Sequence, residues 1–100
     1  MTLNTEHSTE PELLFQLEKA HEQVEVGALY THYRTETSYK VLNLAIIEAT
    51  QEVAVIYQAA SNPLKSVTWI RPLSSFLEKI YIGDIQVNRF QKKSLPQGKI

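Results

Sequence analysis

Residues 39–60 read YKVLNLAIIEATQEVAVIYQAA, and this stretch decides the fold class. Its first part, Tyr39–Glu48, is apolar on both faces of an extended chain, which is typical of a central or strongly curved strand. Its second part, Glu52–Ala60, alternates in the period of a strand. A short turn at 49–51 separates the two parts. The stretch therefore predicts two consecutive β-strands. Strict alternation in the first strand sorts its side chains into two sets: Tyr39, Val41, Ala45 and Ile47 on one face, and Leu42, Leu44 and Ile46 on the other.

Toward the C-terminus, short strand patterns alternate with turn signals. Asn62-Pro63 initiates a turn, and Pro72 ends the next strand because proline lacks the N–H that a strand ladder uses. Gly83-Asp84 is typical of a two-residue hairpin turn of type II′ or I′. The pattern predicts strands at Val67–Arg71, Lys79–Ile82 and Ile85–Val87, with one helical turn at Leu73–Leu77.

Toward the N-terminus, Ala28–Arg34 is a short candidate strand, and a helix precedes it. Thr9 and Glu12 match the capping box T-x-x-E, and Pro11 stands in the first turn, where its missing N–H costs nothing. An apolar stripe at helical spacing follows, formed by Leu13, Leu14, Leu17, Ala20, His21 and Val24. This stripe either docks on the rest of the chain or binds a partner.

The chain has 100 residues, 43% of them hydrophobic, and no cysteine. These values indicate one small domain without a disulfide framework. Residues 1–10 lack the pattern of a signal peptide, and no apolar run approaches the roughly 20 residues of a membrane span, so we expect a soluble cytoplasmic protein. The predicted organisation is a disordered N-terminus at 1–9, an acidic amphipathic helix at 10–25, a β-domain at 26–90 and a basic disordered tail at 91–100.

Several short strands with tight turns favour a mainly β fold. We expect a small SH3-like β-barrel of about five short strands with an added N-terminal α-helix, because closure removes the exposed edges of an open sheet.

Charge divides unevenly along the chain. The formal net charge is -1, but residues 1–26 hold six acidic residues against one lysine, and residues 27–100 hold nine basic residues against five acidic ones. Such an asymmetry suggests a basic binding face beside an acidic segment that could mask it, or two solvated surfaces.

The sequence lacks the motifs of common catalytic sites. It contains no G-x-G-x-x-G, P-loop, G-x-S-x-G or H-E-x-x-H, and its three histidines have no spacing that suits a metal. We therefore expect a non-catalytic protein without a cofactor or metal. The enzymatic alternative is a minor or accessory enzyme with His32 as its acid–base group, and the sequence offers no companion for that residue.

An aromatic and basic set offers the best candidate ligand-binding residues. Aromatic faces stack on planar ligands, and arginine forks bind carboxylate or phosphate. The candidates are Tyr30, His32, Tyr33, Arg34, Tyr57, Trp69, Arg71 and Arg89. Structural roles compete with this interpretation: Trp69 can belong to the core, His32 to a plain surface, and Arg71 and Arg89 to buried structural forks. Tyr39, Phe76 and Phe90 are expected to fill the barrel.

Six short motifs in order resemble one bacterial family. They are Gly27-x-x-Tyr30-x-His32-Tyr33-Arg34, Tyr39-x-Val41, Val55-Ile56-Tyr57, Trp69-Ile70-Arg71-Pro72-Leu73, Phe76-x-Glu78 and Arg89-Phe90. Over residues 27–90 this series resembles the family called domain of unknown function 1653. The resemblance implies a shared domain and brings no established activity. Members commonly carry His-x-Glu-Thr after the second strand, where this chain has Ile47-Glu48-Ala49-Thr50.

The sequence thus predicts a binding module that recognises a nucleotide, RNA or a peptide through an aromatic and basic face. The alternative is a protein–protein adaptor or homo-oligomer that uses the N-terminal helix. No membrane partner is expected.

Overall fold

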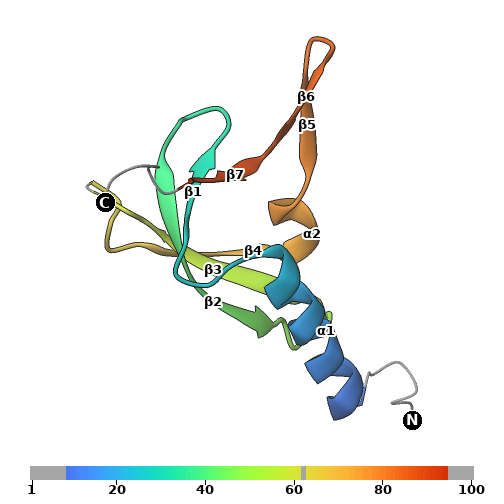
Figure 1. The fold of residues 1–100 in the computed structure, drawn as a ribbon. Coiled ribbons are helices and arrows are strands. Elements are labelled where there is room, and N and C mark those ends of the chain that lie inside the picture. The colour runs from blue at the N-terminus through green and yellow to red at the C-terminus, as the bar shows by residue number, and fades with distance from the viewer. Residues whose placement is uncertain (1–8, 62, 95–100) are drawn as a thin grey trace.

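The computed structural model describes residues 9–61 and 63–94, and within them the chain is mainly β with an N-terminal helix, as predicted (Figure 1). The elements are α1 (Glu10–Gln23), β1 (Leu29–His32), β2 (Ser38–Ile46), β3 (Val53–Ala59), β4 (Thr68–Pro72), α2 (Leu73–Phe76), β5 (Lys79–Ile82), β6 (Ile85–Asn88) and β7 (Phe90–Lys92). Residues 1–8 and 95–100, which fall in the predicted disordered ends, lie outside the described residues.

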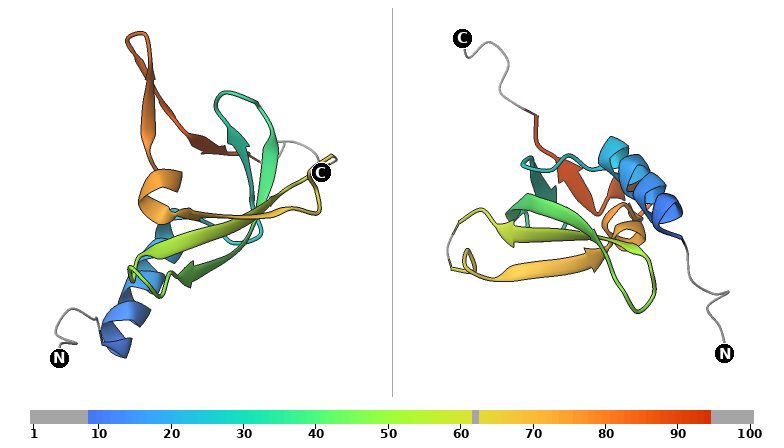
Figure 2. Two further views of the ribbon diagram at one scale, coloured as in Figure 1. Left: turned by 180° about the vertical axis from the view of Figure 1, so that it is seen from behind. Right: turned by 90° about the horizontal axis from the view of Figure 1, so that it is seen from below.

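Five strands form one antiparallel sheet in the order β4-β3-β2-β1-β7, and β5 pairs with β6 in a separate hairpin. Among the described residues no pairing joins β4 to β7, so the sheets are not closed into a barrel. The hairpin projects away from the sheet, and α1 lies at the opposite end of the molecule (Figures 1 and 2).

The predicted tail needs a correction at its start. Gln91 and Lys92 belong to β7, which pairs with β1 through Thr31↔Gln91 and Tyr30↔Lys92. Both side chains are exposed, so nothing in their polarity marks a strand. Within this three-residue edge strand only Phe90 is buried in the core, so residues 91 and 92 leave no apolar pattern in the sequence.

A β-bulge in β2 changes the predicted assignment of faces. Val41 pairs with Tyr57 and Asn43 pairs with Ile56, so Leu42 is an extra residue in the ladder. The bulge reverses the alternation after Val41, and both Val41 and Leu44 are buried in the same core. The apolar character on both predicted faces of this strand is therefore explained by a register shift.

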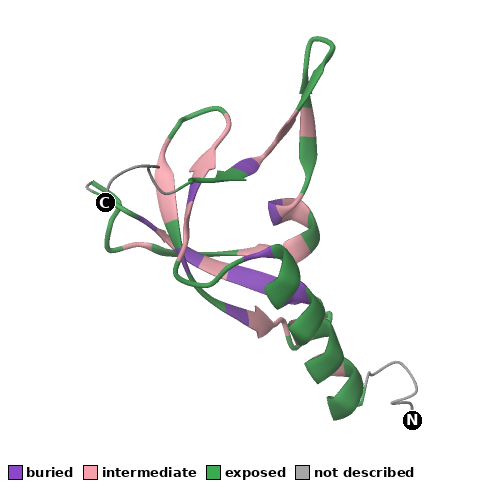
Figure 3. Cartoon of the chain, viewed as in Figure 1, coloured by how far each residue is buried: buried purple, intermediate pink, exposed green. Residues whose placement is uncertain are grey.

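The core lies inside the curve of the sheet and contains a cluster of stacked and edge-on rings. Phe76 of α2 stacks on Phe90 with ring centroids 4.2 Å apart and meets Tyr30 and Tyr57 edge-on at 5.3 and 5.6 Å. Phe76 and Phe90 are buried and Tyr39 packs against them, as predicted for core aromatics. Burial is concentrated on β3 and the adjacent part of β2 (Figure 3).

Helix α1 closes one end of this core. Its capping box is formed as predicted: the Glu12 N–H donates to Thr9 Oγ1, and the Thr9 N–H donates to Glu12 Oε1. Ala20 and Val24 are buried in the core cluster, whereas Leu14 and Phe15 are exposed. The C-terminal half of the helix thus docks on the sheet, and its N-terminal half presents apolar side chains to solvent.

The β5–β6 hairpin turns at Gly83-Asp84, as predicted. Gly83 has φ +61° and Asp84 has no positive φ, which matches a type II′ turn. In the part of the chain that the structure describes, neither helix is long and apolar enough to cross a lipid bilayer.

Candidate ligand-binding site

The register of the sheet gathers aromatic side chains on its inner face. Tyr57 of β3 pairs with Trp69 of β4, and His32 of β1 pairs with Phe90 of β7. Directly paired residues share one face of a sheet, so these four side chains lie on one side together with Tyr39. The sequence supplies the aromatics, and the antiparallel register brings them together.

These side chains line a pocket of about 170 Å³. We call it the aromatic pocket; its lining residues are His32, Thr35, Tyr39, Tyr57, Trp69, Arg71 and Phe90. Four of the eight residues predicted from the sequence therefore meet in one hollow: His32, Tyr57, Trp69 and Arg71. Trp69 is 40% exposed at its rim.

Arg71 is held in place by three groups. Its Nε donates to the Tyr57 hydroxyl at 3.2 Å, its Nη1 donates to Ser75 Oγ at 2.9 Å, and its guanidinium lies 5.5 Å from the centre of the Phe90 ring. Among the described residues no hydrogen bond engages Nη2. Arg71 is thus a positioned cation whose remaining N–H groups are available to a ligand.

His32 is held as a neutral imidazole. Its Nδ1 accepts hydrogen bonds from the backbone N–H groups of Arg34 and Thr35, at 3.2 and 3.5 Å. Burial lowers the pKa of His32, and the positive charges of Arg71, Arg89 and Arg34 lower it further. Since Nδ1 is an acceptor, the neutral ring carries its proton on Nε2. Within the described chain Nε2 has no hydrogen-bond partner.

Tyr33 and Arg34 lie on the loop after β1, beside the pocket. The Arg34 guanidinium lies over the Tyr33 ring at 5.7 Å and donates to its hydroxyl at 3.2 Å. Neither residue lines the aromatic pocket. The positive charge of Arg34 lowers the pKa of His32, so this charge lies near the pocket.

Two other predicted site residues lie outside the pocket. Tyr30 is buried, and its hydroxyl accepts the Glu25 N–H at 3.0 Å, which ties the end of α1 to β1. Arg89 pairs with Glu78 at 2.8 Å, and its buried Nε has no partner among the described residues. In this structure Arg89 joins the base of the hairpin to the sheet.

Sequence reasoning assigned Tyr39 and Phe90 to the core and did not select Thr35, yet all three line the pocket. Tyr39 and Phe90 do pack in the core, so each ring contacts the core on one side and lines the pocket on the other. Only the cross-strand register could have identified them.

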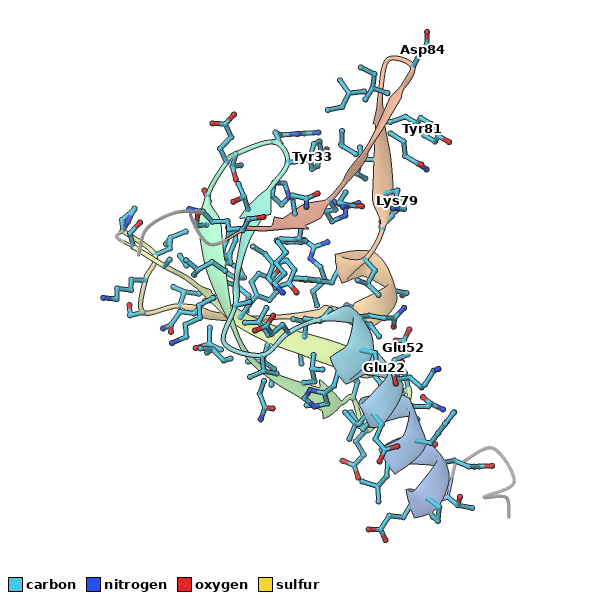
Figure 4. All side chains as sticks on the ribbon, in the orientation of Figure 1. Glu22, Tyr33, Glu52, Lys79, Tyr81 and Asp84 are labelled. Atoms are coloured by element: carbon cyan, nitrogen blue, oxygen red, sulfur yellow. The ribbon has the colours of Figure 1, made fainter. Side chains whose placement is uncertain are left out.

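A second hollow of about 560 Å³ lies between the loop after β1 and the hairpin. Tyr33 and Lys79 stand on either side of it (Figure 4), and His32 lines it as well. Lys79 donates to Asn88 Oδ1 at 3.1 Å, and Asn88 donates to Gln91 at 2.8 Å. Its polar side chains are thus partly paired with one another.

Helix α1 contributes no residue to the aromatic pocket. The idea that the acidic helix masks the basic surface therefore does not apply to this pocket. Two residues beyond the helix, the exposed side chain of Glu25 forms an ion pair with Lys92 of β7.

The chemistry of the aromatic pocket follows from its lining side chains. Its lining includes four aromatic rings, one arginine and one neutral histidine, and it includes no carboxylate or thiol. His32 thus has no acidic companion in the pocket that would orient it as a general base. Across the described residues no group of three or more His, Asp or Glu side chains could hold a metal ion.

Comparisons with known proteins assign the domain. A family model described as "Protein of unknown function (DUF1653)" matches residues 28–92, which include every residue of the aromatic pocket. A crystal structure of a DUF1653 protein from Bordetella bronchiseptica is similar with a TM-score of 0.58 and 28% identity, covering 75% of this chain and 97% of the other. A search of curated protein sequences finds no significant match.

Proposed function

We propose that this chain, which belongs to the DUF1653 family of proteins of unknown function, is a non-catalytic binding module whose aromatic pocket takes one nucleotide, free or within RNA. The observation that carries the proposal is the convergence of Tyr39, Tyr57, Trp69 and Phe90 around Arg71. Rings of this kind stack on a base, and the arginine adds positive charge at the same place.

The size of the pocket restricts the part of the ligand that enters. Pockets that enclose a whole drug-sized molecule measure roughly 300–1,000 Å³. At about 170 Å³ the aromatic pocket suits one planar ring, and the rest of the ligand would stay outside. A base is such a ring, and it leaves the sugar and phosphate at the rim.

The charges near the rim favour an anion. The charges of Arg34 and Arg71 both lower the pKa of His32, and neither arginine forms an ion pair within the described chain, whereas Arg89 is paired with Glu78. The acid nearest in sequence to the pocket is the exposed Glu36, which follows Thr35. The surplus of arginine would attract a phosphate group, as aromatic and basic surfaces do on single-stranded nucleic acids.

A peptide fits less well. Peptides that bind to sheets commonly add a strand to a free edge, where their backbone is recognised. The aromatic pocket lies on the face of the sheet, and β1, which carries His32, is already paired on both sides by β2 and β7. β4, which carries Trp69 and Arg71, is an edge strand, but it has only five residues and ends at Pro72, which has no N–H to donate. A peptide would therefore find little backbone to pair with beside the pocket.

The SH3-like architecture belongs to the same proposal. The sheet reads β7-β1-β2-β3-β4 from edge to edge, and the helical turn α2 follows β4. One further contact, between β4 and β7, would complete a five-stranded barrel around the core. Small barrels bind through such faces, and here this is an analogy of fold.

The test is calorimetric titration of the full chain with the four nucleoside monophosphates and with single-stranded RNA hexamers. Arg71→Gln should weaken binding about tenfold or more, since it removes the charge and the fork. Lys40→Gln is the matched control, because Lys40 is an exposed cation adjacent in β2 to Tyr39 and so lies on the opposite face. Tighter binding of RNA than of monophosphates, with a steep salt dependence, would identify RNA as the ligand. If neither ligand binds at low salt, the proposal is wrong.

Self-association through α1 is the second candidate, and the exposed Leu14 and Phe15 favour it. A second copy that covers these side chains would bury apolar surface that α1 leaves in water. Light scattering of the full chain tests this idea, with Phe15→Glu expected to shift a dimer to a monomer. A wild-type chain that is monomeric at high concentration would exclude it.

A further inference from the structure

The polar groups of the aromatic pocket are nearly all hydrogen-bond donors, and this restricts the bases that it can accept. No carboxylate or amide side chain is present among its seven lining residues. Resting on the proposed nucleotide function, we infer that the pocket selects keto bases, uracil and guanine, over the amino bases cytosine and adenine.

Arg71 provides the first fixed donor. Tyr57 and Ser75 hold Nε and Nη1, and Phe90 lies against the guanidinium, so the plane of the group is set before a ligand arrives. The remaining N–H groups can only donate, because guanidinium has no acceptor. An arginine of this kind pairs well with the carbonyl and N7 acceptors of a base such as guanine.

His32 provides the second fixed hydrogen-bond donor. Two backbone N–H groups occupy Nδ1, which fixes the tautomer with the proton on Nε2. His32 lines both the aromatic pocket and the second hollow, and Nε2–H lacks a partner among the described residues. The ring is also in contact with Phe90 and Tyr33, at centroid distances of 5.1 and 5.0 Å, which restrains its orientation.

The hydroxyls of the pocket are biased in the same direction. Tyr57 Oη accepts from Arg71 Nε, and Thr35 Oγ1 accepts from the Thr37 N–H at 3.3 Å. Each oxygen has used one of its two lone pairs and keeps its own hydrogen to donate. Tyr39 is the one lining hydroxyl that, within the described residues, has no hydrogen bond and can act in either sense.

A donor-lined pocket penalises an amino group. When the exocyclic amino group of cytosine or adenine meets Arg71 or His32, two donors face each other and both lose their water. The carbonyl of uracil or guanine at the same position accepts instead. We expect a preference of about tenfold or more, which corresponds to one hydrogen bond gained on one side and one donor left unpaired on the other.

Matched ligands test the inference on the full wild-type chain. Uridine and cytidine monophosphates differ at position 4, which is a carbonyl or an amino group, and at N3, which is an N–H donor or an acceptor nitrogen. Inosine and adenosine monophosphates differ correspondingly at position 6 and N1, so a sulfur-substituted ligand is needed to isolate the carbonyl. Calorimetry should give about tenfold or tighter binding for the keto member of each pair. Replacing the carbonyl oxygen at position 4 of uridine monophosphate by sulfur, a poor acceptor, should remove most of this advantage without any change in the protein.

Two variants separate selection from stacking. Arg71→Met keeps the aliphatic stem and removes the donors, so the keto-to-amino ratio should fall toward one while some binding remains. Trp69→Ala should weaken all four ligands by a similar factor and leave the ratio intact. Circular dichroism confirms that each variant is folded, and the sulfur-substituted ligand tests the same point without a variant.

The outcomes distinguish this inference from the function on which it rests. Binding of all four ligands with equal affinity overturns the keto preference and leaves the nucleotide site standing. A preference for cytidine and adenosine monophosphates also overturns it. If no nucleotide or RNA binds, both proposals fall together.

Discussion

The inner face of the five-stranded sheet and the β5–β6 hairpin use the same kinds of residue with opposite results. Tyr57 and Phe90 of the sheet are 5% and 6% exposed, whereas Tyr81 and Ile85 of the hairpin are 69% and 67% exposed (Figure 3). Both regions alternate in the strand period. The difference is that α1 and α2 close over the curved sheet, while nothing in the described chain covers the hairpin. The types of side chain favour strands in both regions, but their burial depends on whether a second layer of structure packs on those strands.

The hairpin is anchored to the rest of the chain by contacts at its base. An isolated two-stranded hairpin is marginally stable in water. Here the Arg89 N–H donates to the Glu78 carbonyl at 2.9 Å, and the Arg89 guanidinium pairs with the Glu78 carboxylate. Tyr33 N–H in turn donates to the Arg89 carbonyl, so the base of the hairpin is tied to the loop beside the aromatic pocket.

The largest expected effect comes from removing the ring at the centre of the sheet's core. Phe76→Ala should lower the free energy of unfolding by about 3–5 kcal/mol, because a fully buried ring is replaced by a cavity between Tyr30, Tyr57 and Phe90. Urea unfolding followed by circular dichroism measures it. Tyr81→Ala on the hairpin is the control and should change stability by less than about 0.5 kcal/mol. Equal losses in both variants would break the comparison.

A smaller and local effect is expected at the turn of the hairpin. Gly83 has φ +61° and open space around its missing Cβ, so Gly83→Ala introduces backbone strain without a clash, costing about 1–2 kcal/mol. Amide hydrogen exchange in β5 and β6 should accelerate about 5- to 30-fold while β3 stays protected. Acceleration in β3 as well would show that hairpin and sheet unfold as one unit.

The smallest effect is a pH dependence from His32, at the junction of the two regions. Burial and the arginines keep the pKa of His32 below its ordinary value of about 6.5. Between those two values the unfolded chain binds a proton that the folded chain does not, so stability is full above about pH 6.5 and declines as the pH falls through this window. Urea unfolding from pH 7.5 to 5 should show the decline.

His32→Gln should flatten this pH dependence, since the titrating ring is gone. His21→Gln, on the exposed side of α1, is the matched control and should retain it. If the slope survives in His32→Gln and disappears in His21→Gln, the assignment to His32 is wrong.

Features encoded by a few neighbouring residues could be predicted from the sequence. The Thr9–Glu12 capping box and the Gly83-Asp84 turn each depend on local geometry, and both are present as expected. The bulge at Leu42 could not be predicted, because it depends on how β2 aligns with β3. Nor could the part of β7 beyond Phe90, since Gln91 and Lys92 are polar and exposed and show no strand pattern.

The sequence could predict the kinds of residue in the candidate site but not which of them come together. Aromatic and basic residue types identified His32, Tyr57, Trp69 and Arg71, which do meet. The same criterion also selects Tyr30, which is as buried as Tyr57 but whose hydroxyl meets the Glu25 backbone and not Arg71. Residue type does not encode where a ring lies in the core, and only the fold decides which tyrosine lines the pocket.

The open edge of the sheet has a consequence for solubility. β4 presents unpaired backbone groups along one side within the described chain, next to the exposed Ile70. Such an edge is a template on which another chain can grow into an aggregate. The strand is only five residues long and ends at Pro72, which has no N–H to offer a growing ladder. Pro72 thus withholds one N–H donor from the ladder of a chain that would add to this edge. Pro72→Val would restore that donor on the strand that also carries the exposed Trp69.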